Sequence, residues 1–148
     1  MLELFNTPKW IEFIEDRKIQ NSTDAEEYIE TKILPQFERL GYGNYTVIRK
    51  LDGKKIGCCG LFDREGLEGI DIGFALLPIF EKQGYAFECV NKLKEAAFQH
   101  FRLSKLSAIT DKNNLASQYL LQKIGLSFVG NTKLPHKMEE VLLYQLLS

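Results

Sequence analysis

Residues 71–88 read DIGFALLPIFEKQGYAFE and pass from a strand pattern into a helix pattern. The strand pattern covers Glu68 to Leu77, and the helix pattern covers Gly84 to Phe101. Between them, consecutive amides from Lys82 to Ala86 lead into a helix N-terminus, where unpaired N–H groups and the helix dipole favour an anion. Gly84 would let a phosphate approach the backbone closely. The stretch has neither a P-loop ending nor a dinucleotide fingerprint, so alone it predicts only an anion site.

The segments on both sides alternate between helix and strand patterns. Before residue 71 we expect one helix from Pro8 with Thr7 as its cap, and a second from a Thr23–Glu26 capping box to Leu40. Pro35 should split the second helix. Further elements are expected at 44–51, 55–62, 105–110, 114–124, 126–129 and 141–147. This order, an antiparallel meander followed by two crossover units, predicts an α+β fold with a mixed sheet.

Length, charge and composition narrow the class of protein. The chain has 148 residues, of which 45% are hydrophobic and 26% charged, and it contains no repeat or linker, which predicts one domain over residues 1–148. A net charge of −1 argues against a general nucleic-acid binder. There is neither an apolar run of about 18 residues nor a signal peptide. We therefore expect a cytoplasmic protein with no nucleic-acid partner and no membrane partner.

Cysteines and histidines are few and poorly placed for metal or disulfide chemistry. Adjacent Cys58 and Cys59, with Cys89, do not form a disulfide framework, and we expect reduced thiols. His100 and His136 lie far apart in the sequence, which gives no metal-ligand spacing, so no metal is expected.

Charge is distributed unevenly along the chain. Residues 1–40 carry nine acidic and five basic side chains, whereas residues 81–148 carry six acidic and nine basic ones. An acidic N-terminal part beside a basic C-terminal part suits a cationic substrate and an anionic cofactor. Chance on a balanced surface explains the pattern equally well.

Three stretches, taken in order, resemble the GNAT superfamily of acetyl-CoA-dependent N-acetyltransferases, and most of all the RimJ/RimL-type ribosomal-protein N-terminal acetyltransferases. They are Asp71–Pro78, Gln83–Glu88, and Asn114–Ser117 with Lys123–Gly125. The resemblance runs from about Asn6 to Val129. It implies the GNAT fold, with a mostly antiparallel central sheet flanked by helices, in a monomer or homodimer. It also implies transfer of acetyl from acetyl-CoA to a primary amine, either a protein N-terminus or a small molecule, by direct attack on the thioester.

The resemblance also implies where acetyl-CoA binds. Its pantetheine arm would pair with the backbone of Phe74, Ala75 and Leu76, where this strand splays from residues 105–110. The amide of Leu76 would polarise the thioester carbonyl. The pyrophosphate would be held by five consecutive amides, those of Lys82, Gln83, Gly84, Tyr85 and Ala86.

Two residues of the following helix complete the implied site. Asn114 would hydrogen-bond the pantetheine, and Ser117, one turn later, would lie near the sulfur and help protonate the leaving thiolate. From the residues alone, Asn114 is explained as a helix N-cap and Ser117 as a surface serine. A cap and a cofactor contact are compatible.

Acetyl transfer requires a neutral amine, so a carboxylate should accept its proton directly or through water. Asp71 is our first choice, because it lies on the strand that leads to the thioester and shares a face with Gly73. Glu68, at the start of the same strand, is the second choice. A solvated strand residue explains Asp71 as well, and a turn position explains Glu68.

The sequence departs from the family pattern at three points. Glu81 stands where the pyrophosphate motif usually begins with Gln or Arg. Leu121 stands where many relatives have a tyrosine general acid, and Tyr119 lies about 200° round the helix from it. Relatives begin with a strand that is expected to be missing here. Two alternatives follow: a non-catalytic CoA-binding module, or an interaction module that keeps the GNAT fold without binding CoA.

Overall fold

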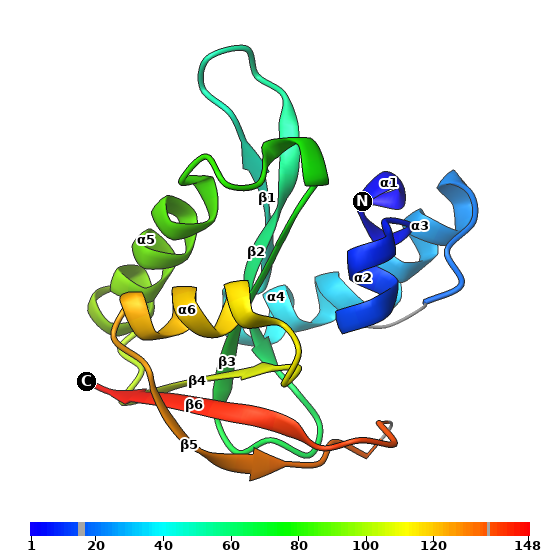
Figure 1. Ribbon diagram of the computed structural model, residues 1–148. Coiled ribbons are helices and arrows are strands. Elements are labelled where there is room, and N and C mark those ends of the chain that lie inside the picture. Colours follow the sequence, from blue (N-terminus) through cyan, green and yellow to red (C-terminus); the bar gives the residue numbers. More distant parts are fainter. Residues whose placement is uncertain (15–16, 136) are drawn as a thin grey trace. The chain divides into compact units, whose positions relative to one another are not determined.

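The computed structural model describes residues 1–14, 17–135 and 137–148, so His136 lies outside the described residues. Figure 1 shows the elements in chain order. They are α1 (Leu2–Phe5), α2 (Pro8–Phe13), α3 (Ser22–Tyr28), the π-helical turn η1 (Ile29–Ile33), α4 (Leu34–Leu40), β1 (Asn44–Ile48), β2 (Lys55–Asp63), β3 (Ile70–Leu76), the 3-10 turn η2 (Pro78–Phe80), α5 (Tyr85–Gln99), β4 (Lys105–Thr110), α6 (Leu115–Lys123), β5 (Ser127–Thr132) and β6 (Val141–Leu147).

The six strands form one sheet in the order β1-β2-β3-β4-β6-β5. The pairs β1–β2, β4–β6 and β5–β6 are antiparallel, and β3 pairs in parallel with β4, with Asp71 opposite Ser107. The predicted α+β class with a mostly antiparallel sheet is confirmed. The described residues before β1 form helices and no strand, as the departure from the family pattern predicts.

The chain divides into two compact units, residues 1–60 with 74–86, and residues 61–73 with 87–148. In the first unit the N-terminal helices pack around buried aromatic rings. Thr7 caps α2 by accepting a hydrogen bond from the Trp10 N–H, as predicted. The Arg17 guanidinium lies 5.7 Å from the ring of Phe5, 5.8 Å from Trp10 and 4.9 Å from Tyr28, so cation–π attraction joins the segment after α2 to α3.

The segment from α3 to α4 differs from the predicted helix at its N-cap and agrees with the prediction at Pro35. The N-cap is Asn21, whose Oδ1 accepts a hydrogen bond from the Asp24 N–H at 2.9 Å. The predicted N-cap, Thr23 of the capping box, was therefore wrong by two residues. Pro35 does split the helix, through the π-helical turn η1. Proline lacks an N–H group and its ring crowds the preceding turn, and a wider turn before it relieves both problems.

Gly57 on β2 allows a close backbone approach within the first unit. A Cβ atom at this position would lie 2.2 Å from the carbonyl oxygen of Ala75 and 2.8 Å from the Cα atom of Leu76. The Leu77 N–H also donates to the Ile56 carbonyl at 2.8 Å. The end of β3 therefore rests directly on the backbone of β2. At Gly73 on β3, by contrast, a Cβ would meet only the ring of Phe62 at 3.0 Å.

We expect Gly57→Ala to lower the free energy of unfolding by about 2–4 kcal/mol, because a backbone carbonyl has to move. Gly73→Ala is the matched control on a strand, and its cost should stay below about 1.5 kcal/mol because an aromatic ring can shift. Urea unfolding of both variants measures the difference. Equal costs would contradict the close approach at Gly57.

In the second unit, β6 lies between β4 and β5, and α6 contacts both β4 and β5 (Figure 1). Leu106, Leu121 and Leu126 are fully or almost fully buried there. The Lys94 ammonium on α5 donates to the Ile124 carbonyl at the end of α6 at 2.8 Å. A cation at a helix C-terminus satisfies a carbonyl that has no partner within the helix.

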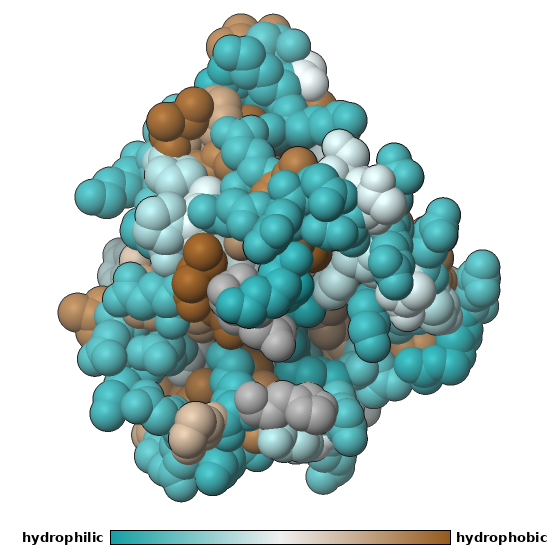
Figure 2. Space-filling model, turned by 90° about the vertical axis from the view of Figure 1, so that its right-hand side faces the viewer, coloured by the Kyte–Doolittle hydropathy of each residue, from teal (hydrophilic) through white to brown (hydrophobic). Residues whose placement is uncertain are grey.

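The surface carries exposed hydrophobic side chains in scattered positions. On the face drawn in Figure 2, small hydrophobic groups (brown) lie among hydrophilic side chains (teal). Such scatter is normal for folded proteins and by itself indicates no partner. Among the described residues, no helix combines the length and the apolar character that crossing a membrane requires.

Candidate active site

The loop between β3 and α5 belongs to the first unit and has the backbone geometry of an anion site. Lys82 has φ +60° and Gly84 has φ +87°, so two left-handed residues turn the chain into α5. Within the described chain, no hydrogen bond is donated by the N–H groups of Lys82, Gly84 or Tyr85. Successive N–H groups in such a turn form a concavity with positive partial charge. A Cβ at Gly84 would have nothing within 4 Å, so the space beside its backbone is open.

The Arg49 side chain, from the β1–β2 hairpin, contacts residues at both ends of this loop. The Arg49 guanidinium lies over the ring of Phe80, 4.9 Å from its centroid. Hydrogen bonds to Asp52 and to Tyr85 raise the pKa of Arg49 further above its ordinary value. The same guanidinium lowers the pKa of Asp52 to about 2. Arg49 therefore joins the hairpin turn to both ends of the loop.

The three strand residues expected to pair with pantetheine lie at the end of β3. Phe74 and Ala75 are half-buried, and Leu76 is buried. Leu76 packs with Ile56 and Phe80, so the end of the strand and the start of the loop share one small core. These residues belong to the same unit as the loop.

Asn114 and Ser117 belong to the second unit, at the start of α6. The Ser117 N–H donates to Asn114 Oδ1 at 3.2 Å, which makes Asn114 the N-cap. The amide nitrogen of Asn114 hydrogen-bonds no described residue, so its two N–H groups are available to a ligand. Leu121 is only 1% exposed, whereas Tyr119 is exposed. The expectation that Tyr119 faces away from the Leu121 position is thus confirmed.

Asp71, also in the second unit, is 1% exposed and held by Arg64. Arg64 Nε donates to Oδ1 at 3.1 Å and Nη2 to Oδ2 at 3.2 Å. Burial raises the pKa of Asp71, and the charge and hydrogen bonds of Arg64 oppose that rise. Sequence reasoning missed Arg64. The signal was a carboxylate between two isoleucines of a strand, since a buried charge needs a partner.

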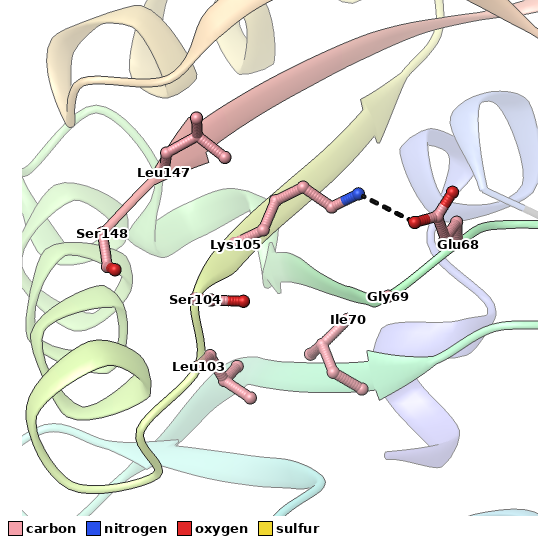
Figure 3. A pocket seen from close by; sticks show the side chains of 8 residues that line it. All are labelled: Glu68, Gly69, Ile70, Leu103, Ser104, Lys105, Leu147 and Ser148. Atoms are coloured by element: carbon pink, nitrogen blue, oxygen red, sulfur yellow. Dashed lines mark ion pairs between the residues drawn. The ribbon is translucent and has the colours of Figure 1, made fainter.

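Glu68 lies in a different environment in the same unit. It lines an open hollow of about 600 Å³ at the starts of β3 and β4 and the end of β6 (Figure 3). Its carboxylate points toward Lys105 Nζ, 3.5 Å away, and its side chain is 95% exposed. Of the two carboxylates predicted as bases, Asp71 is thus buried in a bidentate ion pair with Arg64, and Glu68 is solvated.

Comparison with known proteins places this geometry in a family. A family model described as an acetyltransferase (GNAT) domain matches residues 1–127. The chain belongs to this family. The resemblance inferred from the three sequence stretches is confirmed.

Relatives of this GNAT chain include the uncharacterized N-acetyltransferase YjdG of Bacillus subtilis, 30% identical over 96 residues. That match covers 63% of this chain and 55% of the relative, so it spans little more than half of the relative's length.

Solved structures share the fold at low sequence identity. An acetyltransferase from Agrobacterium tumefaciens has a TM-score of 0.81 and 18% identity, covering 99% of this chain and 82% of its own. RimL, a ribosomal L7/L12 alpha-N-protein acetyltransferase in complex with coenzyme A, has a TM-score of 0.82 and 15% identity, covering 99% and 84%. Spermidine N-acetyltransferase from Vibrio cholerae, with CoA and spermine, has a TM-score of 0.77 and 14% identity, covering 99% and 86%.

Proposed function

We propose that this GNAT chain binds acetyl-CoA and transfers its acetyl group to a primary amine. The observation that carries the proposal is the loop at Lys82–Tyr85, with open N–H groups and unfilled space beside Gly84, in a member of the acetyltransferase family. A diphosphate fits such a concavity at the start of the 15-residue helix α5, because its charge meets both the N–H groups and the helix dipole.

The remaining residues have proposed roles along the same ligand. The backbone of Phe74, Ala75 and Leu76 pairs with the pantetheine arm, and the Leu76 amide polarises the thioester carbonyl. The acceptor nitrogen attacks that carbonyl carbon, the carbon–sulfur bond breaks, and the thiolate leaves. Ser117 donates a hydrogen bond to the sulfur and relays to it the proton that the nitrogen loses as the amide forms, so the serine hydroxyl is restored. No covalent enzyme intermediate is formed in this scheme.

Asp71 is the proposed acceptor of the amine proton, directly or through water. Burial raises its pKa, and a carboxylate with a higher pKa is a stronger base. Arg64 holds both oxygens and so fixes the orientation of the carboxylate. Glu68 remains the second choice, since it is paired with Lys105 and open to water.

The proposed acceptor is a cationic amine, either a protein N-terminus or a small molecule. The acidic excess of residues 1–40 favours such a partner by charge. The names of two structural neighbours, RimL and spermidine N-acetyltransferase, represent these two kinds of acceptor. We place the reaction in the cytoplasm, in a monomer or homodimer and without a metal.

A second candidate is a CoA-binding module without catalysis. Two observations favour it: the buried Leu121 offers no proton, and both oxygens of Asp71 are already bound by Arg64. Such a module would bind acetyl-CoA and release no thiol with any amine.

Calorimetric titration with acetyl-CoA, followed by an amine screen with thiol detection, tests the proposal. Micromolar binding together with amine-dependent thiol release is the expected result. Binding without thiol release for protein N-terminal peptides, polyamines and simple amines would favour the module. Absence of binding by folded protein would contradict both candidates.

Asn114→Asp separates the two roles of Asn114. The aspartate keeps the oxygen that caps α6, so the free energy of unfolding should change by less than about 0.5 kcal/mol. It lacks the amide donor, and we expect the Kd for acetyl-CoA to rise about five- to tenfold. Asn114→Ala, the comparison variant, should lose both functions. An unchanged Kd in Asn114→Asp, measured by calorimetry, would leave Asn114 as a cap alone.

A further inference from the structure

Lys9 on α2 forms an ion pair with Glu81, the residue directly before the loop at Lys82–Tyr85. Lys9 Nζ lies 2.5 Å from Glu81 Oε2, and both residues belong to the first unit. The side chains are 55% and 25% exposed, respectively. Glu81 directly precedes Lys82, the first residue with an open N–H group, and its backbone is extended. A negative side chain thus stands at the entrance of a site that we assign to a dianionic diphosphate.

A carboxylate beside a diphosphate opposes binding by charge repulsion, which weakens as salt is added. The guanidinium that contacts the loop from the β1–β2 hairpin has partners of its own. Arg49 is bound to Asp52 and Tyr85. Lys9 is paired with the Glu81 carboxylate, 72 residues away in the sequence.

We propose that Lys9 is a positioning residue of the cofactor site: it neutralises Glu81 and turns its carboxylate toward α2, which allows an anion to bind the loop. The inference rests on the proposed function, because it requires CoA to bind at these amides. It explains how the chain accommodates Glu81, an acidic residue directly before its proposed anion loop. It also assigns the N-terminal helix α2 a part in cofactor affinity.

A double-variant cycle tests the inference, with the Kd for acetyl-CoA measured by calorimetry at low salt. Lys9→Met should weaken binding about three- to tenfold, since Glu81 is left without its counter-charge. Glu81→Gln should bind as tightly as the wild type or more tightly. Lys9→Met in the Glu81→Gln background should change the Kd less than twofold, because no carboxylate remains to be neutralised. Lys92→Met, which breaks an exposed ion pair with Glu95 on α5, is the matched control and should leave the Kd unchanged.

The outcomes separate the inference from the function on which it rests. If Lys9→Met weakens binding equally in both backgrounds, Lys9 acts on the ligand and not on Glu81, and the inference is overturned. The same holds if Lys9→Met binds like the wild type. If the wild type itself binds no acetyl-CoA, the proposed function fails and takes the inference with it. The Lys9→Met defect should also shrink at about 0.5 M salt, because added ions screen the exposed carboxylate, and a salt-independent defect would indicate a structural cause.

Discussion

Replacing Gly84 with valine is expected to raise the Kd for acetyl-CoA by about 100-fold or more while the protein stays folded. Gly84 has φ +87°, which a β-branched residue adopts only with strain, and the valine side chain would fill the space beside the open N–H groups. A Cβ at this position meets no atom of the protein within 4 Å, so the core is not disturbed. Calorimetric titration, with circular dichroism to check folding, measures both parts of the expectation.

Gly41→Val is the matched control for this variant. Gly41 has φ +81° and likewise nothing within 4 Å of a Cβ, but it is the C-cap of α4. Both variants carry similar backbone strain, of about 1–3 kcal/mol, so their stabilities should fall by similar amounts. Only Gly84→Val should lose acetyl-CoA. An unaffected Kd in Gly84→Val would contradict the proposed cofactor loop.

Local patterns predicted most elements of the fold. β4 and β6 have the predicted bounds, because their apolar runs are flanked by clear breaks. The position before an apolar-periodic segment predicted Asn113 or Asn114 as the cap of α6, and the cap is Asn114. The insertion of β6 between β4 and β5 was not predicted, since strand order depends on contacts far apart in the sequence. The short helix α1 was missed as well, and its four residues are too few for a periodic signal.

The candidate site was also predicted only in part: its loop was predicted, but the charge partners of its carboxylates were not. The anion loop was predicted from a contiguous stretch, and Lys82 and Gly84 have positive φ values there, while anion binding stays a prediction. The charge partners did not follow, because Arg64 meets Asp71 across a turn and Lys9 meets Glu81 over a long sequence separation. A single sequence specifies that a buried or misplaced charge needs a partner, but the identity of the partner is a property of the folded chain.

The second large effect is expected at Asp71. If Asp71 accepts the amine proton, Asp71→Asn should lower kcat by about 100-fold or more and leave the Kd for acetyl-CoA within about twofold of the wild type. Asparagine keeps the shape of the side chain but does not take up a proton. Steady-state kinetics with the best amine from the screen gives kcat, and Glu68→Gln is the matched control, with wild-type kcat expected. Loss of activity in Glu68→Gln alone would transfer the base role to Glu68.

The pH dependence gives a test that loss of structure would not mimic. Because burial raises the pKa of Asp71, kcat/KM of the wild type should fall on the acid side at a pH above the ordinary range of a carboxyl group, and Asp71→Asn should lack this limb. The folded state then binds more protons than the unfolded state between the ordinary and the raised pKa, so the contribution of Asp71 to stability decreases as pH rises through that window. Asp71→Asn should remove this slope while costing about 1–3 kcal/mol, since Arg64 loses its partner but reaches solvent. A wild-type acid limb in the variant would show that another group carries the proton.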